Sequence, residues 1–104
     1  MGGETDFVKD LVASKPVVVF SKSYCPHCTK AKKSLAAIGA KYEVLELDQM
    51  GNGSAIQDAL VEITGQRTVP NVFVAGSSIG GGDDTVRLHK SGQLATMITN
   101  AGAA

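Results

Sequence analysis

Apolar residues follow two kinds of spacing along the chain, and each predicts a different element of secondary structure. Short runs that are continuous or alternating predict strands at 16–20, 42–47 and 71–75, with a short fourth strand around Ile79. Apolar residues three or four positions apart predict helices at 5–14, 26–38, 54–64, 83–91 and 94–101. The first strand, the helix after it and the second strand form one β-α-β unit, which should be parallel and right-handed. The pattern therefore indicates an α/β fold.

The ends of these elements carry further signals. The first helix should bury four apolar residues on one face, namely Phe7, Val8, Leu11 and Val12. Ser54 and Gln57 have the spacing of a capping box at the start of a helix. Pro70 precedes a strand, and because only about 5–6% of X–Pro bonds are cis, the sequence alone favours a trans peptide. Residues 102–104 are expected to fray.

Length and overall charge limit the class of protein. The 104 residues of the chain suffice for one domain, 1–104, with a single hydrophobic core. Ten basic residues balance ten acidic ones, so the charge gives no sign of a nucleic-acid partner. No stretch approaches the roughly 18 apolar residues of a membrane span, and no membrane partner is expected.

The basic residues are nevertheless unevenly distributed. No acidic residue occurs between Asp10 and Glu43, whereas six lysines do: Lys15, Lys22, Lys30, Lys32, Lys33 and Lys41. This local excess favours a thiolate over a thiol and attracts an anionic substrate. For Lys30, Lys32 and Lys33 the preferred interpretation is the solvated face of an amphipathic helix.

The two cysteines of the chain, Cys25 and Cys28, lie where the first strand gives way to the second helix. Pro26 suits the first helical turn, so Cys25 should fall at or next to the N-cap. Free backbone N–H groups and the positive end of the helix dipole stabilise a thiolate there. Cys28 lies one turn further on the same face, deeper but within disulfide reach. Because a thiolate attacks disulfides and a second thiol releases the product, Cys25 is the candidate nucleophile and Cys28 the candidate resolving thiol.

Three other interpretations of the cysteine pair fit less well. A structural disulfide across two residues would constrain the unfolded chain very little. A zinc site needs about four ligands, and the chain offers only His27, His89 and scattered carboxylates beside the pair. A c-type haem site needs histidine after the second cysteine, where Thr29 stands. Redox chemistry is therefore the preferred interpretation.

Four segments in the right order extend this motif: Ser21–Cys28, Thr64–Pro70, Ile79–Asp84 and Leu88–Gly92. Together they resemble the glutaredoxin family over nearly the whole chain. The resemblance implies a thioredoxin fold, a four-stranded mixed sheet flanked by helices, with Pro70 cis and facing the active site. It also implies a dithiol-type glutathione-dependent oxidoreductase that reduces protein–glutathione mixed disulfides and protein disulfides. In the family pattern Cys25 matches the nucleophile and Cys28 the resolving cysteine.

The resemblance also implies a set of glutathione-binding residues: Lys22, Tyr24, Gln57, Arg67, Thr68, Val69, Pro70, Gly82, Asp83 and Asp84. Among them, Lys22, Gln57 and Arg67 match positions that hold the glycine carboxylate. The backbone of Val69 matches the stretch that pairs with the cysteinyl part of glutathione, as an added strand would. The helix start at 82–84 matches the site of the γ-glutamyl end.

Capping and solvation also explain some of these residues. Lys22 is equally well explained as a solvated loop lysine. Gln57 is explained as the capping partner of Ser54, and Asp83 and Asp84 as N-cap residues, a role compatible with ligand binding.

His27 departs from the family pattern, since many dithiol members have tyrosine at this position. The hypothesis for His27 is a modulating role, because a partly protonated imidazole adds positive charge beside the Cys25 thiolate and shifts the redox potential. The chain also lacks the extra cysteine that some relatives carry near Gly81 and Gly82, so disulfide regulation is not expected there.

The resemblance implies glutathione as reductant and co-substrate, no metal, and a monomer whose partners are glutathionylated or disulfide-containing proteins. The alternative is a [2Fe–2S] carrier or sensor, since some family members bridge such a cluster between two subunits through the first cysteine and glutathione. Pro26 and the second cysteine disfavour this alternative. A reducing compartment is expected, taken as the cytoplasm, with an organelle after transit-peptide removal as the alternative.

Overall fold

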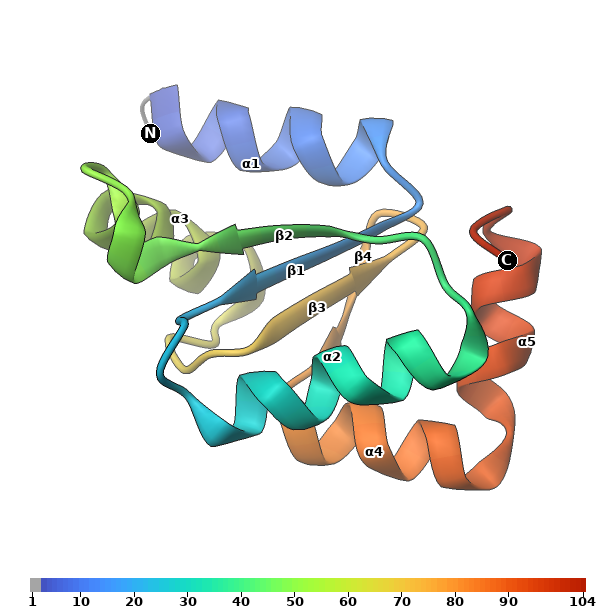
Figure 1. The fold of residues 1–104 in the computed structure, drawn as a ribbon. Helices are drawn as coiled ribbons and strands as arrows, with labels where there is room; N and C mark the ends of the chain where they lie inside the picture. Colours follow the sequence, from blue (N-terminus) through green and yellow to red (C-terminus); the bar gives the residue numbers. More distant parts are fainter. Residues whose placement is uncertain (1–2) are drawn as a thin grey trace.

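The structure, a computed structural model, describes residues 3–104 as a four-stranded sheet between two layers of helices (Figure 1). In chain order the elements are α1 (Gly3–Ser14), β1 (Val17–Ser21), α2 (Pro26–Ile38), β2 (Glu43–Glu46), the 3-10 helix η1 (Leu47–Gln49), α3 (Gly53–Thr64), β3 (Asn71–Val74), β4 (Ser77–Gly80), α4 (Gly82–Ser91) and α5 (Gln93–Asn100). Every predicted helix and strand is present, with bounds that differ by at most two residues. The short helix η1 is not among the predicted elements.

The sheet has the strand order β2-β1-β3-β4. Strands β1 and β2 are parallel and joined through α2, as the β-α-β pattern predicted, whereas β1–β3 and β3–β4 are antiparallel. In the middle of the sheet Val19 of β1 lies opposite Val44 on one side and Val72 on the other. The sheet is thus mixed, as the resemblance implied.

Strand β1 is buried along its whole length, as is typical of a continuous apolar run. Val17 and Val19 point to one face of the sheet, while Val18 and Phe20 point to the other. There the ring of Phe20 packs edge-to-face on that of Phe73, with 5.6 Å between the ring centroids. Each such buried side chain contributes about 1.5–3 kcal/mol relative to exposure. The strand is therefore a rigid base for the cysteine loop that follows it.

Helices α1 and α3 cover one face of the sheet, and α2, α4 and α5 cover the other (Figure 1). The predicted face of α1 needs correction at Phe7, which is 43% exposed, whereas Val8 and Val12 are buried. Successive helical residues are about 100° apart, so the stripe that contains Val8 and Val12 continues through Thr5 rather than Phe7. The Thr5 hydroxyl donates a hydrogen bond to Glu62 of α3 (3.2 Å).

The predicted capping box at Ser54 is wrong. Helix α3 begins at Gly53 and its N-cap residue Asn52 makes no side-chain capping bond. Because the helix starts earlier than expected, Gln57 lies too far along it to reach back to the N-cap, and its amide instead donates to the carbonyl of Arg67 (2.6 Å).

Residues 102–104 were predicted to fray, and this prediction is wrong. Ala103 is 1% exposed and packs among residues of α2 and α5, while its carbonyl accepts a hydrogen bond from Lys41 N–H (2.8 Å). This contact spans most of the chain and has no local sequence signal.

Among residues 3–104, no helix is long and apolar enough to cross a membrane.

A buried amide joins three elements near the site. The side chain of Asn71, fully buried at the start of β3, donates to the hydroxyl of Thr64 in α3 (3.1 Å) and accepts from the hydroxyl of Ser78 in β4 (2.7 Å). Buried polar groups are tolerated when they are paired in this way. The bridge fixes both ends of the loop that contains Pro70.

Candidate active site

Cys25 is the N-cap residue of α2, with an extended backbone (φ −88°, ψ 119°) and Pro26 as the first helical residue. Its Sγ accepts a hydrogen bond from the backbone N–H of Cys28 (3.3 Å). The sulfur is half-buried and faces the positive end of the helix dipole. The structure thus confirms the predicted position of Cys25 at the N-cap.

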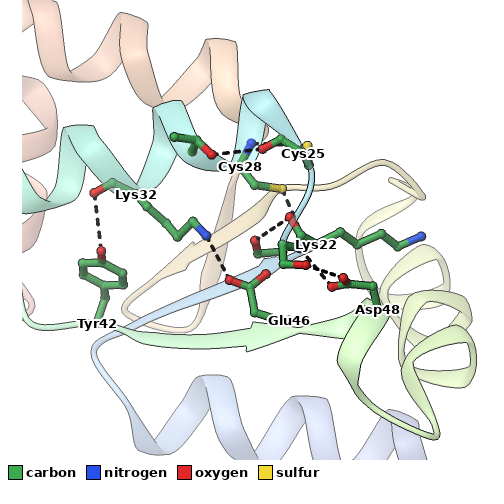
Figure 2. A network of polar contacts seen from close by, with 10 residues as sticks. Lys22, Cys25, Cys28, Lys32, Tyr42, Glu46 and Asp48 are labelled. Carbon is green, nitrogen blue, oxygen red and sulfur yellow. Dashed lines mark hydrogen bonds and ion pairs between the residues drawn. The ribbon is translucent and has the colours of Figure 1, made fainter.

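Cys28 lies one turn deeper and is fully buried, and both cysteines are free thiols. Its Sγ accepts a hydrogen bond from the backbone N–H of Lys22 (3.4 Å; Figure 2). Burial raises the pKa of the Cys28 thiol above its ordinary value, although the Lys22 N–H opposes this shift. The pair therefore consists of an accessible sulfur at a helix N-terminus and a buried one behind it.

The loop before β3 lies against the accessible sulfur. The Cys25 thiol is 3.7 Å from the carbonyl oxygen of Val69, and the Val69–Pro70 peptide is cis. The cis bond agrees with the resemblance. The prediction of a trans peptide, which relied on the low general frequency of cis X–Pro bonds, is wrong because tertiary contacts override that frequency. Gln66, which sequence reasoning did not single out, donates through Nε2 to the carbonyls of Thr68 and Pro70 (2.9 Å each).

A surface groove of about 310 Å³ runs from this loop to the start of α4. Of the residues singled out in the sequence, those that line it are His27, Thr68, Val69, Pro70, Gly82, Asp83 and Asp84. Lys22, Tyr24, Gln57 and Arg67 do not line this groove. The structure thus gathers six of the ten predicted glutathione-binding residues in one groove and leaves the other four outside it.

The start of α4 is built on Gly82, which packs against α2. A Cβ atom at Gly82 would lie 2.7 Å from the carbonyl oxygen of His27. The carboxylate of Asp84 accepts from the N–H of Gly81 (2.9 Å) and binds Arg87 (2.6 Å). These bonds, the Gly81 N–H first, hold the pKa of Asp84 below its ordinary value. Asp84 therefore serves the helix start from its third helical position, rather than as the N-cap residue that was predicted.

Asp83 differs from its neighbour because its side chain is 80% exposed. Its carboxylate lies 3.8 Å from the ammonium of Lys30 and 4.0 Å from Nδ1 of His27, both on α2. The N-cap role predicted for Asp83 is also wrong, since Gly81 occupies that position. An exposed carboxylate at the groove can accept a cationic ligand group.

The other four predicted residues come from two segments, the loop before α2 and the region around α3. The guanidinium of Arg67 pairs with the exposed carboxylate of Asp58 (2.8 Å), and the carbonyl of Arg67 accepts the Gln57 amide. Lys22 is half-buried beside the cysteines, and the ring of Tyr24 is 71% exposed. Arg67 and Lys22 supply positive charge, but the carboxylate of Asp58 already binds Arg67 and would compete with an anionic ligand for it.

An unpredicted carboxylate anchors the cysteine loop. Asp48 of η1 accepts hydrogen bonds from both the N–H (2.9 Å) and the hydroxyl of Ser23 (Figure 2). The Ser23 hydroxyl, and after it the Ser23 N–H, hold the pKa of Asp48 below its ordinary value. Next to Ser23, the carbonyl of Lys22 accepts the N–H of Cys25 (3.1 Å). The position of Cys25 thus depends on a contact with η1 that only the fold creates.

The solvated-face interpretation is wrong for Lys32. Its ammonium forms a 2.9 Å ion pair with Glu46 of β2, and the two side chains are only 24% and 23% exposed (Figure 2). The hydrogen bond to Glu46 raises the pKa of Lys32 above its ordinary value. Lys30 and Lys33 are exposed, as predicted.

Among residues 3–104, no three His, Cys, Asp or Glu side chains form a group that could hold a metal ion.

A cysteine pair at the start of the helix after the first strand of a four-stranded mixed sheet defines a thiol–disulfide oxidoreductase of the thioredoxin superfamily. The family model "Glutaredoxin" matches residues 17–79, more than half of the chain. The chain belongs to the glutaredoxin family, whose members are glutathione-dependent oxidoreductases.

Individual relatives agree with this assignment. A glutaredoxin of Ricinus communis is 60% identical over 95 residues, which are 91% of this chain and 93% of the relative. Glutaredoxin-C4, chloroplastic, of Oryza sativa subsp. japonica is 54% identical over 94% of this chain and 74% of the relative. The crystal structure of a buckwheat glutaredoxin–glutathione complex is 49% identical and has a TM-score of 0.92, with 96% of this chain and 91% of that chain covered.

Proposed function

We propose that the protein reduces protein–glutathione mixed disulfides and protein disulfides, with Cys25 as the nucleophile and Cys28 as the resolving thiol. The observation that carries the proposal is the contrast between the two sulfurs. Cys25 is accessible at the N-terminus of α2 and accepts a backbone N–H, while Cys28 is buried behind it. An incoming disulfide therefore meets Cys25 first.

For a glutathionylated protein, the Cys25 thiolate attacks the glutathione sulfur. The Cys25–glutathione disulfide forms, and the protein thiolate leaves and takes up a proton. A second glutathione thiolate then attacks the glutathione sulfur on Cys25, which yields glutathione disulfide and regenerates the Cys25 thiolate. This route does not require Cys28, although the Cys28 thiolate can release the glutathione instead by attacking the Cys25 sulfur, which forms the Cys25–Cys28 disulfide.

For a protein disulfide, Cys25 first forms a mixed disulfide with the substrate. The thiolate of Cys28 then attacks the Cys25 sulfur, so the Cys25–Cys28 disulfide forms and the second substrate thiol leaves. Two molecules of glutathione reduce this disulfide in turn. The buried position of Cys28 supports the proposal, because it keeps this thiol away from solvent until Cys25 carries a mixed disulfide.

We further propose that glutathione lies across the groove with its γ-glutamyl end at α4 and its glycine end at Lys22 and Arg67. The exposed carboxylate of Asp83 would take the ammonium group, and backbone N–H groups at Gly82 would take the γ-glutamyl carboxylate. The backbone at Thr68 and Val69 would pair with the cysteinyl part beside Pro70. The glutathione of the buckwheat complex supports this class of ligand.

The remaining predicted residues would have supporting roles in this pose. Tyr24 offers an exposed ring beside Cys25. Asp84 would hold the helix start through Gly81, and Gln57 would hold the loop of Arg67, since both side chains are already hydrogen-bonded to the backbone. His27 would modulate the site through its contact with Asp83.

The cysteine roles are tested by glutathione-coupled reduction of two substrates, a glutathionylated protein and a protein disulfide. Cys25→Ser should abolish both activities. Cys28→Ser should keep the first and lose the second, because only the second needs an internal resolving thiol. Activity of Cys25→Ser on either substrate would contradict the proposal.

The binding pose is tested by the KM for glutathione. Asp83→Asn and Arg67→Met should each raise it about three- to tenfold, as expected when one charge-assisted contact of roughly 1 kcal/mol is lost. Asp58→Asn is the matched control, because it removes the carboxylate that competes for Arg67 and should not raise the KM. An unchanged KM in both Asp83→Asn and Arg67→Met would refute the pose.

Assembly, metal content and location are also proposals. We expect a monomer in light scattering and no visible absorbance in the purified protein; a coloured dimer would instead favour the [2Fe–2S] alternative. The cytoplasm remains the expected location. The name of the rice relative supports an organelle as the alternative, and cell fractionation distinguishes the two.

A further inference from the structure

A half-buried ion pair lies one helical turn beyond the proposed resolving thiol. Cys28 and Lys32 are four residues apart on α2 and therefore share a face of the helix. The ammonium of Lys32 points toward the end of β2, where it binds Glu46 beside the loop that contacts Cys28 (Figure 2). Neither side chain takes part in the thiol–disulfide exchange steps of Cys25 and Cys28.

The charges of this pair are poorly screened. Both side chains are largely shielded from water, and the second carboxylate oxygen of Glu46, Oε1, is buried without a hydrogen-bond partner in the described part of the chain. Charges in such surroundings act more strongly on their neighbours than charges at the surface.

Lys32 and Cys28 interact through their charges. The hydrogen bond to Glu46 is the main cause of the raised pKa of Lys32, and a thiolate at Cys28 raises it further. By reciprocity the ammonium of Lys32 favours the thiolate of Cys28, and this charge acts alongside the larger effects of burial and of the Lys22 N–H on that thiol. Glu46 has the opposite sign and reduces this effect, while its hydrogen bond keeps Lys32 protonated.

We propose that Lys32 is a positioning residue for the second half of the dithiol cycle, and that Glu46 limits the positive charge that Lys32 presents to Cys28. The inference rests on the proposed function, because it concerns the attack of Cys28 on a mixed disulfide at Cys25. In that step the Cys28 thiol loses its proton to water, its thiolate bonds to the Cys25 sulfur, and glutathione leaves as a thiolate that takes up a proton. Lys32 remains protonated throughout.

Other groups around the two residues act in the same region. Cys28 faces the thiol of Cys25, the N–H of Lys22 and the hydroxyl of Ser21. Lys32 faces Glu46, and its carbonyl accepts a hydrogen bond from the hydroxyl of Tyr42 (3.5 Å). Within this set, Lys32 and Glu46 can each be changed without altering a hydrogen bond to either sulfur.

The test uses two substitutions that should act in opposite directions. Lys32→Met removes the positive charge and should disfavour the Cys28 thiolate, whereas Glu46→Gln removes the negative charge and should favour it. Lys32→Arg should restore the wild-type behaviour. Lys33→Met is the matched control, since Lys33 is exposed on the same helix. Thermal melting confirms that each variant is folded.

Two readouts are measured. The ultraviolet absorbance of the thiolate is followed against pH in a Cys25→Ser background, where Cys28 is the remaining thiol. The release of glutathione from the Cys25–glutathione disulfide is followed in a single turnover with Cys28 intact. At neutral pH, Lys32→Met should slow this release by roughly three- to tenfold and Glu46→Gln should accelerate it, as expected for one half-buried charge.

Opposite shifts in both readouts, with Lys32→Arg and Lys33→Met close to wild type, support the inference. If Lys32→Met and Glu46→Gln shift the readouts in the same direction, or do not shift them, the inference is overturned. A shift in the same direction would indicate lost packing, which affects both variants alike. If the wild type itself releases no glutathione, the dithiol cycle fails together with the inference. Release by the wild type without opposite effects in the variants overturns the inference alone.

Discussion

The contact between α4 and α2 at Gly82 supports a quantitative prediction. In Gly82→Ala the new Cβ would lie 2.7 Å from the carbonyl oxygen of His27 and 3.1 Å from its Cβ. Ordinary contacts begin near 3.4 Å, so the helices must separate by about 0.7 Å. Overpacking of this kind costs about 1–3 kcal/mol, and the higher helix propensity of alanine offsets roughly 0.5–1 kcal/mol of it. We expect a net loss of about 1–2 kcal/mol.

The assay is thermal unfolding together with the KM for glutathione. A loss of 1 kcal/mol lowers the Tm of a domain of this size by roughly 4–8 °C. Because His27 and Gly82 both line the groove, the KM should also rise, by about fivefold for each 1 kcal/mol of lost binding. Gly81→Ala is the control, since its Cβ would lie 3.5 Å from the carbonyl of Pro70, an ordinary contact. A Tm of Gly82→Ala equal to that of the wild type, or an equal loss in Gly81→Ala, would refute the reasoning.

Three further substitutions test the contacts that support the site. Because the pKa of Asp48 is lowered in the folded protein, this carboxylate stabilises the fold above its ordinary pKa of 3.8, and the stabilisation is lost as the pH falls through the lower folded value. Asp48→Asn should therefore reduce the loss of Tm on acidification. An unchanged dependence of Tm on pH would argue against the Ser23 contact. Asn71→Ala should cost about 1–3 kcal/mol in urea unfolding, because both hydroxyl partners lose a buried amide. Gly53→Ala should lower the Tm more than Gly82→Ala, since its Cβ would lie 1.9 Å from the carbonyl oxygen of Leu47, and a milder effect would contradict the packing at η1.

Local sequence signals predicted the elements that carry the cysteines. Helix α2 begins at Pro26, as the sequence indicated, because proline suits the first turn. It ends before Gly39, which adopts the left-handed conformation (φ 80°) that ends a helix. The same signals placed Cys25 at the N-cap and Cys28 one turn deeper. These features depend on residues close together in the chain.

The rest of the site depends on contacts between distant segments. Asp48 binds Ser23 and Glu46 binds Lys32 only because β2 lies beside β1 and α2 crosses the sheet. Hydrophobic periodicity cannot distinguish a half-buried lysine from a solvated one on the same helix. Ala103 was misjudged for the same reason, since residues near the end of a chain pack only where a distant segment receives them.

The resemblance to a family carried information that the residues alone did not. It placed a cis bond at Pro70, against the general frequency, and the structure agrees. It also brought together Thr68, Val69 and Asp83, which line one groove although the chain separates them. Packing and capping arguments would have left Asp83 as a helix-start residue.

The central claim is that Cys25 receives the glutathione during turnover. Its most direct test is the intact mass of the Cys25→Ser and Cys28→Ser variants after incubation with glutathione disulfide, followed by peptide mapping. We expect one glutathione on Cys25 in Cys28→Ser and none on Cys28 in Cys25→Ser, because Cys28 is buried. Glutathione on Cys28 in Cys25→Ser, or an unmodified Cys28→Ser variant, would contradict the account.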